Sequence, residues 1–219
     1  MAEKLIIWDF DGVIADTEHG AVYRYYELLK DFGINITLKQ TIDCIMGKSQ
    51  QMQLESLSKY TDKLNIYNIK EFNKESDIAA VKNLKLTAGI EEIFKMQNFE
   101  QCIATGNSFD GIKSRIYPLN LDKYITKNHI FSADLVERGK PEPDLFLYAA
   151  EKMGYKPENS IIIEDSMNGL LAGIRADIKT IAYIEHCLID KKEYTSMIKK
   201  LGIDTIFDNM YDLKKYLKK

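Results

Sequence analysis

The sequence predicts an α/β fold: a Rossmann-like parallel sheet core covered by helices, with a small all-helical cap domain inserted after the first strand. Two observations predict it. From residue 88 onward, short apolar runs alternate with segments whose apolar residues recur at helical spacing. Between residues 16 and 87 only the helical spacing is found, over a stretch much longer than a simple strand–helix–strand crossover requires.

Short apolar runs are predicted to form the strands of the core, residues 1–15 and 88–219. Near-continuous apolar character is typical of strands that are buried on both faces of a parallel sheet. In chain order the runs are Ile6–Trp8, Gln101–Ala104, His129–Ser132, Ser160–Ile163, Thr180–Tyr183 and Thr205–Phe207. Helical patterns between or after them include Asp144–Met153, Met167–Arg175 and Tyr211–Leu217.

The inserted stretch, residues 16–87, is predicted to be a small insertion of several helices. Its first helix carries apolar side chains at helical spacing, namely Val22, Tyr25, Leu29 and Phe32. Similar patterns begin at Gln51 and Ile66, and Gly33 and Gly47 break the stretch into separate helices. The alternative is a set of ordinary crossover helices packed on the sheet.

Composition bounds the function class. The chain has 219 residues, of which 45% are hydrophobic and 29% charged, as in soluble globular proteins. No apolar stretch approaches the ~20 residues of a membrane span, and no signal-peptide pattern precedes the first strand, so we expect a cytoplasmic protein. A net charge of −3 gives no reason to expect a nucleic-acid partner. Three widely spaced cysteines argue against a disulfide framework or a zinc cluster.

The first strand runs into Asp9-Phe10-Asp11-Gly12-Val13, which holds two carboxylates one residue apart. Alternate strand residues share a face, and two like charges held close together need a cation or a proton between them. Mg²⁺ prefers such oxygen ligands. A surface turn after a strand, or the acidic metal motif of nucleotide-sugar enzymes, would show the same residues. This motif alone therefore does not decide between these interpretations.

Three more polar segments follow predicted strands, where the carboxyl ends of parallel strands form a ligand-binding edge. Thr105-Gly106-Asn107-Ser108 offers a hydroxyl and small residues that let backbone N–H groups approach an anion, or else simply caps a helix. Lys140 lies on a turn fixed by two prolines, where a lysine is often only solvent-exposed. Glu164 and Asp165 reach one metal only if the chain already turns at Asp165; the alternative is a helix start decorated with acids.

Together these four segments resemble the motifs of the haloacid dehalogenase superfamily, whose phosphotransferases use an aspartate nucleophile. Asp9–Val13 matches the first motif, Thr105 the second, Lys140 the third and Glu164-Asp165 the fourth. The insertion is similar to the helical cap of the branch that contains beta-phosphoglucomutase, phosphoglycolate phosphatase and several sugar-phosphate phosphatases. The resemblance covers essentially the whole chain.

The resemblance implies a role for each core residue. Asp9 would be the nucleophile that forms an aspartyl-phosphate, and Asp11 the general acid and base. Mg²⁺ would be held by the Asp9 carboxylate, the Asp11 backbone carbonyl, Glu164 and Asp165, with Asp165 the more direct ligand of the last two. Thr105, Lys140 and the segments at Gly12, Gly106 and Asn107 would bind and stabilise the phosphoryl group.

Charge supports a metal independently of the family. Asp9, Asp11, Glu164 and Asp165 bring up to four negative charges together, whereas Lys140 returns one. At ~4 Å, a like-charge pair costs about 4 kcal/mol at an effective dielectric near 20. A divalent cation would relieve this repulsion.

The expected activity is Mg²⁺-dependent hydrolysis of a small phosphomonoester, such as a sugar or sugar-acid phosphate. Mutases that resemble beta-phosphoglucomutase carry a histidine where Ala21 stands here, with His19 two residues away, and a cap arginine where Gln50 stands. Both departures favour a phosphatase over a mutase. A dehalogenase needs no second acid at Asp11, and a receiver-type signalling module places its acceptor aspartate on a middle strand. A catalytically silent metal- or phosphate-binding protein remains an alternative.

The cap is expected to choose the substrate, because the core motifs contact only the phosphoryl group and the metal. The candidates for hydrogen bonds to the leaving group are Lys48, Ser49, Gln50 and Gln51. Lys48 as a solvated lysine is the alternative. The partner is thus a small phosphate ester, and a monomer is the default expectation.

Overall fold

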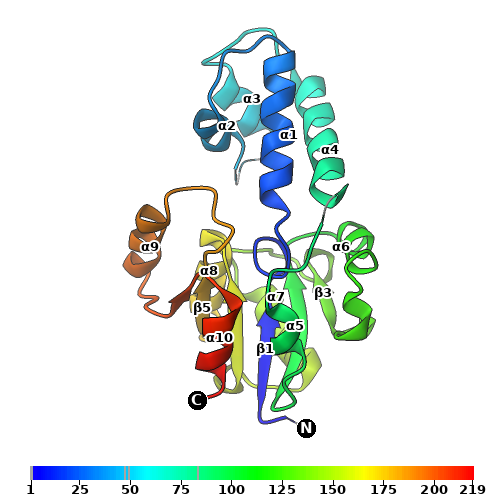
Figure 1. The fold of residues 1–219 in the computed structure, drawn as a ribbon, viewed down its shortest axis with the longest axis vertical. Coiled ribbons are helices and arrows are strands. Elements are labelled where there is room, and N and C mark those ends of the chain that lie inside the picture. Colours follow the sequence, from blue (N-terminus) through cyan, green and yellow to red (C-terminus); the bar gives the residue numbers. More distant parts are fainter. Residues whose placement is uncertain (1, 47, 49, 83) are drawn as a thin grey trace. The chain divides into compact units, whose positions relative to one another are not determined.

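The computed structural model describes residues 2–46, 48, 50–82 and 84–219. It divides into two compact units, one formed by Met1–Asp16 with Leu84–Lys219 and the other by Thr17–Asn83 (Figure 1). We call them the core unit and the cap unit. The core unit holds a β-sheet and the helices that cover it, whereas the described part of the cap unit is helical.

The core unit contains a parallel sheet in the order β3-β2-β1-β4-β5-β6. The strands are β1 (Lys4–Trp8), β2 (Phe99–Thr105), β3 (Ile130–Ser132), β4 (Ser160–Glu164), β5 (Lys179–Tyr183) and β6 (Ile206–Phe207). Each corresponds to one of the apolar runs, so the predicted parallel α/β sheet is confirmed. β1 lies in the middle, between β2 and β4, and so its carboxyl end lies near the centre of the edge formed by the carboxyl ends of the strands.

Helices cover both faces of this sheet because the strands are apolar on both faces. Ile6 and Trp8 face a core formed with α5 (Ile90–Phe94), α6 (Phe109–Ile116) and α10 (Met210–Leu217). Leu5 and Ile7, which alternate with them, face α7 (Asp144–Met153) and α8 (Met167–Arg175). α9 (Lys191–Lys200) packs beside β5. Short 3₁₀ turns cover Leu121–Lys123, Lys127–His129, Ala133–Leu135 and Pro157–Asn159.

The cap unit contains α1 (Glu18–Asp31), α2 (Leu38–Ile45), α3 (Gln50–Leu57) and α4 (Ile66–Lys82). The predicted apolar stripe of α1 is buried at Val22, Tyr25 and Leu29. Tyr25 meets Phe72 of α4 edge to face at 5.6 Å between ring centroids. Phe32 follows the end of α1 and also packs against Phe72. The predicted break at Gly33 follows α1, whereas Gly47 lies outside the described residues.

The division of the chain falls a few residues inside the predicted boundaries of 15/16 and 87/88, at 16/17 and 83/84. Residues 84–87 belong to the core unit because they pair with the segment that follows β1. Leu86 bridges to Ala15. The Thr87 amide donates to Ile14 O at 2.8 Å, and its hydroxyl donates to Val13 O at 2.7 Å.

None of the helices in the described part of the chain combines the length and apolar character needed to cross a membrane. Cys44 and Cys102 are buried and Cys187 is partly buried, and all three are thiols rather than disulfide partners.

Candidate active site

The site begins where β1 and β4 end side by side. Trp8 and Ile163 are register partners, and the Asp9 amide donates to Ile163 O at 2.9 Å just past the end of β1. This bond holds Asp9 next to Glu164, the last residue of β4. Because β2 is the other neighbour of β1, its last residue, Thr105, lies at the same edge of the sheet.

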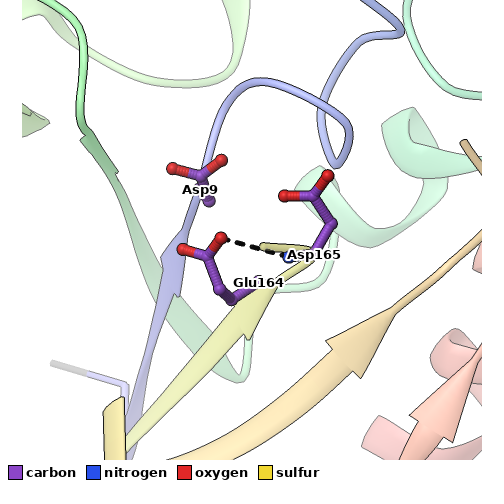
Figure 2. A group of neighbouring side chains, drawn as sticks. All are labelled: Asp9, Glu164 and Asp165. Carbon is purple, nitrogen blue, oxygen red and sulfur yellow. Dashed lines mark hydrogen bonds between the residues drawn. The ribbon is translucent and has the colours of Figure 1, made fainter. Parts of the chain in front are cut away.

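An acid cluster is formed by Asp9, Glu164 and Asp165 (Figure 2). One carboxylate oxygen of each lies within 4.8 Å of the others. Their exposed fractions are only 6%, 0% and 9%. Asp165 follows the end of β4, so the chain is already turning there, which is the condition under which two consecutive acids face one space.

Lys140 lies inside this cluster. Its Nζ donates to Asp9 Oδ1 at 2.6 Å and to Glu164 Oε2 at 2.7 Å, and its side chain is 9% exposed. Two arginines hold the turn that carries it: Arg138 pairs with both carboxylate oxygens of Asp144 at 3.0 Å, and Arg175 donates to Pro141 O at 3.0 Å. The lysine is therefore a fixed counter-charge rather than a solvent-exposed side chain.

Burial, and then the neighbouring Glu164 carboxylate, raise the pKa of Asp9 to about 8, and Lys140 offsets this only in part. Burial alone would lower the pKa of Lys140, but the Asp9 and Glu164 carboxylates outweigh it and raise that pKa. Three carboxylates and one ammonium leave up to two negative charges in a buried space. A hard divalent cation fits this donor set, because every candidate ligand atom is an oxygen.

Glu164 is fixed on all sides. Its Oε1 accepts from the Asp165 amide at 3.2 Å and from the Ser166 amide and hydroxyl at 3.0 and 2.8 Å, while Oε2 accepts from Lys140. The backbone of Gly169 in α8 lies so close that a Cβ there would be 2.0 Å from Glu164 Cδ. Glu164 therefore anchors Lys140 with one oxygen and the start of α8 with the other.

Gly12 makes room for Asp165. Its φ is +72°, a left-handed conformation that favours glycine, and a Cβ built on it would lie 1.9 Å from Asp165 Oδ2. The turn around it is closed by the Gly12 amide, which donates to Ala15 O at 2.9 Å. The backbone of this turn thus lies directly against the acid cluster.

Asp11 contacts two side chains that are not members of the acid cluster. Its Oδ1 accepts from Arg115 at 2.6 Å, and its Oδ2 accepts from the Asn107 amide group. The Thr105 hydroxyl, 0% exposed, accepts from the Asn107 backbone amide at 3.1 Å. The candidate metal group found among the described residues consists of Asp9, Glu164 and Asp165, and the predicted contribution of the Asp11 backbone carbonyl to a metal site stays a prediction.

The segment between Thr105 and α6 serves as a helix cap as well. The Ser108 hydroxyl accepts from the Gly111 amide at 3.2 Å, and Asp134 accepts from the Phe109 amide at 2.6 Å. Gly106 is exposed, and a Cβ built on it would meet no atom within 4 Å. Open space at Gly106 is compatible with the predicted approach of a phosphate to its backbone.

The predicted cap residues make contacts within the cap unit. Lys48 Nζ donates to Asp43 O at 2.5 Å and to the Ser56 hydroxyl at 2.9 Å, so it is not merely a solvated lysine. Gln51 donates to Glu55 at 3.2 Å, and Gln50 is exposed. Ser49 lies outside the described residues. Substrate binding by these side chains stays a prediction.

Arg115 and Tyr194 are site residues that the sequence analysis did not identify. Arg115 contacts Asp11, and the Tyr194 hydroxyl of α9 donates to the backbone carbonyl of Asp165. A signal existed for Arg115: it lies three residues after Ile112 and next to Ile116, both buried, so it falls on the edge of the buried face of α6. An arginine at such a position needs a partner.

Comparisons with known proteins bear on the family and the fold of the chain. The family model described as "Haloacid dehalogenase-like hydrolase" matches residues 6–183. A phosphorylated carbohydrates phosphatase of Thermotoga maritima is 28% identical over 194 residues, which cover 86% of this chain and 88% of that protein. A 6-phosphogluconate phosphatase of Escherichia coli is 22% identical over 178 residues, 80% of each chain. A solved haloacid dehalogenase-like protein of unknown function from Agrobacterium tumefaciens has a TM-score of 0.86 at 25% identity and covers 98% of this chain and 97% of its own.

Proposed function

Because the chain belongs to the haloacid dehalogenase-like hydrolases, we propose that it is a phosphatase that hydrolyses a small phosphomonoester through an aspartyl-phosphate. The observation that carries the proposal is the buried contact of Lys140 with both Asp9 and Glu164, at 2.6 and 2.7 Å. A carboxylate that attacks phosphorus needs a neighbouring cation, because the phosphoryl group is itself negatively charged.

In the first half-reaction an Asp9 carboxylate oxygen attacks the phosphorus, and the bond from phosphorus to the ester oxygen breaks. Asp11 gives its proton to that departing oxygen, which leaves as an alcohol. In the second half-reaction Asp11 accepts a proton from water while the water oxygen bonds to phosphorus. The acyl-phosphate bond then breaks, which restores the Asp9 carboxylate and releases inorganic phosphate.

We further propose Mg²⁺ as the cofactor, held by the Asp9 and Asp165 carboxylates and the Asp11 backbone carbonyl, with Glu164 contributing. When bound, it supplies charge neutralisation and Lewis-acid polarisation of the phosphoryl oxygens. Lys140 holds the nucleophile and adds positive charge beside it. Thr105, Asn107 and the backbone at Gly106 would bind phosphate oxygens through hydroxyl, amide and N–H donors, and the turn at Gly12, whose own N–H donates to Ala15 O, would border the phosphate.

A sugar or sugar-acid phosphate is the substrate class we propose. Two of the relatives are named for phosphorylated carbohydrates and for 6-phosphogluconate. A phosphosugar mutase is the second candidate, but Ala21 and Gln50 stand where the mutases that this sequence resembles carry histidine and arginine. A phosphatase therefore remains the better-supported function. Action as a monomer in the cytoplasm stays a prediction.

The test is a phosphate-release screen over sugar and sugar-acid phosphates with millimolar Mg²⁺, with Asp9→Asn beside the wild type. We expect release by the wild type and loss of at least about 10³-fold in Asp9→Asn, because an amide is a poor nucleophile. Asp122→Asn, which makes the same change at an exposed position, is the control. Isomerisation that depends on a sugar bisphosphate and releases no net phosphate would favour the mutase instead.

A further inference from the structure

Arg115 is a charged residue that the proposed reaction does not use, although it contacts a central residue of it. Its side chain is only 11% exposed, and its Nη1 lies 2.6 Å from Asp11 Oδ1. Its Nε is buried and has no hydrogen-bond partner in the described part of the chain. A guanidinium held this deeply with one donor unsatisfied is costly, so its contact with Asp11 calls for an explanation.

Two side chains that contact Asp11 come from different places in the fold. Asn107, in the loop after β2, donates to Oδ2, and Arg115, two turns into α6, donates to Oδ1. Because each donor takes a different oxygen, rotation of the carboxyl group in either direction breaks one bond. A free aspartate side chain on the turn after β1 would lack this restraint.

The clamp leaves the chemistry of Asp11 possible. Each carboxylate oxygen has two lone pairs, so a single hydrogen bond from Asn107 or Arg115 does not by itself occupy an oxygen of Asp11 fully. Arg115 itself neither gives nor takes a proton, because a guanidinium stays charged in proteins. Its contribution therefore lies in where the Asp11 carboxyl group points.

We propose that Arg115 is a positioning residue that, with Asn107, orients the Asp11 carboxyl group for proton transfer to the departing ester oxygen. The proposal rests on the proposed phosphatase function. Its alternative is a purely structural ion pair that ties α6 to the turn after β1. The two differ in substrate dependence: a misdirected acid slows only esters whose leaving oxygen needs a proton, whereas a loosened fold slows all esters alike.

The experiment compares Arg115→Met with the wild type on p-nitrophenyl phosphate, whose leaving group departs without a proton, and on β-glycerophosphate, whose alkoxide needs one. The measured quantity is kcat/KM, which reports steps up to departure of the leaving group. We expect a loss of at least tenfold more on the alkyl ester than on the aryl ester. Arg115→Lys, which keeps a cation without the planar fork, is expected to show a smaller loss with the same substrate dependence.

Lys113→Met is the matched control, since it removes a positive charge from an exposed position of the same helix. This variant should have the same kcat/KM as the wild type on both substrates. Equal losses on the two esters in Arg115→Met, or no loss, would overturn the positioning role; if that variant does not fold, Arg115→Lys is judged by the same criterion. Wild-type protein that releases no phosphate from either ester in an Asp9-dependent way would overturn the proposed function, and this proposal with it.

Discussion

Substitution of Gly12 by alanine is the sharpest perturbation of the acid cluster, because one added carbon does two separable things. Gly12 has φ +72°, and a non-glycine residue in that region costs about 1–2 kcal/mol. For a chain of this size such a cost lowers the melting temperature by roughly 2–8 °C. In addition, the new Cβ would lie 1.9 Å from Asp165 Oδ2.

The steric effect is larger than a metal site tolerates. To reach even a 3.0 Å contact, the Asp165 oxygen must move by 3.0 minus 1.9, or about 1.1 Å. Mg²⁺ demands near-ideal octahedral geometry, and ligand positions are set to within about 0.2 Å. Substitutions around metal ligands typically cost about 10–100-fold in metal affinity, so we expect Gly12→Ala to weaken Mg²⁺ binding by about 100-fold or more.

Gly154→Ala separates the two effects. Gly154 caps the end of α7 with φ +78°, and a Cβ built there meets no atom within 4 Å. It therefore carries the backbone cost alone. Isothermal titration with Mg²⁺ and thermal unfolding in EDTA give the two readouts. If both variants lose similar stability but Gly12→Ala binds Mg²⁺ as the wild type does, Gly12 does not make room for a metal ligand and the reasoning fails.

Three further predictions follow from the same contacts. Lys140→Met leaves Asp9 and Glu164 without their shared ammonium; kcat for phosphate release should fall by at least about 10²-fold, and near-normal turnover would argue against the charge-balancing role. Gly169→Ala places a Cβ 2.0 Å from Glu164 Cδ, so the free energy of unfolding measured in urea should fall by about 1–3 kcal/mol. An unchanged midpoint of the urea transition would mean that α8 can shift to make room. Mg²⁺ at about 100 times its Kd should stabilise the protein by about 2.7 kcal/mol, or roughly 5–10 °C, and turnover should stop in excess EDTA; full activity there would exclude a required metal.

The sheet was predictable because its strands are buried on both faces and so read as continuous apolar runs; β4, for instance, is Ser-Ile-Ile-Ile-Glu. Helices with a weak pattern were harder. α5 has only five residues, too few for a period to show, and α9 buries only Tyr194 and Ile198 of its ten. α2 had a readable start that was missed, a capping box between Thr37 and Gln40.

The site, too, was predictable only in part. Residues that follow strands could be located from sequence, because the ends of parallel strands meet at one edge of the sheet. Contacts of Arg115 and Tyr194 were out of reach, because they depend on how α6 and α9 are rotated and placed against that edge. β1 ends at Trp8, so strand alternation could not show which residues the Asp11 side chain contacts, namely Asn107 and Arg115.

The two adjacent acids Glu164 and Asp165 owe their different surroundings to two glycines that are far apart in the sequence. Gly169 allows the backbone of α8 to lie against the Glu164 carboxylate. The oxygens of that carboxylate accept hydrogen bonds from Ser166, the Asp165 amide and Lys140. Gly12 instead allows a backbone turn to approach the Asp165 carboxylate. Lone pairs on Glu164 are therefore largely committed to holding the lysine and the helix, which favours Asp165 as the more direct ligand for a cation. In this arrangement the absence of two Cβ atoms, as much as the presence of the acids, allows Glu164 and Asp165 to lie as close to α8 and to the turn after β1 as they do.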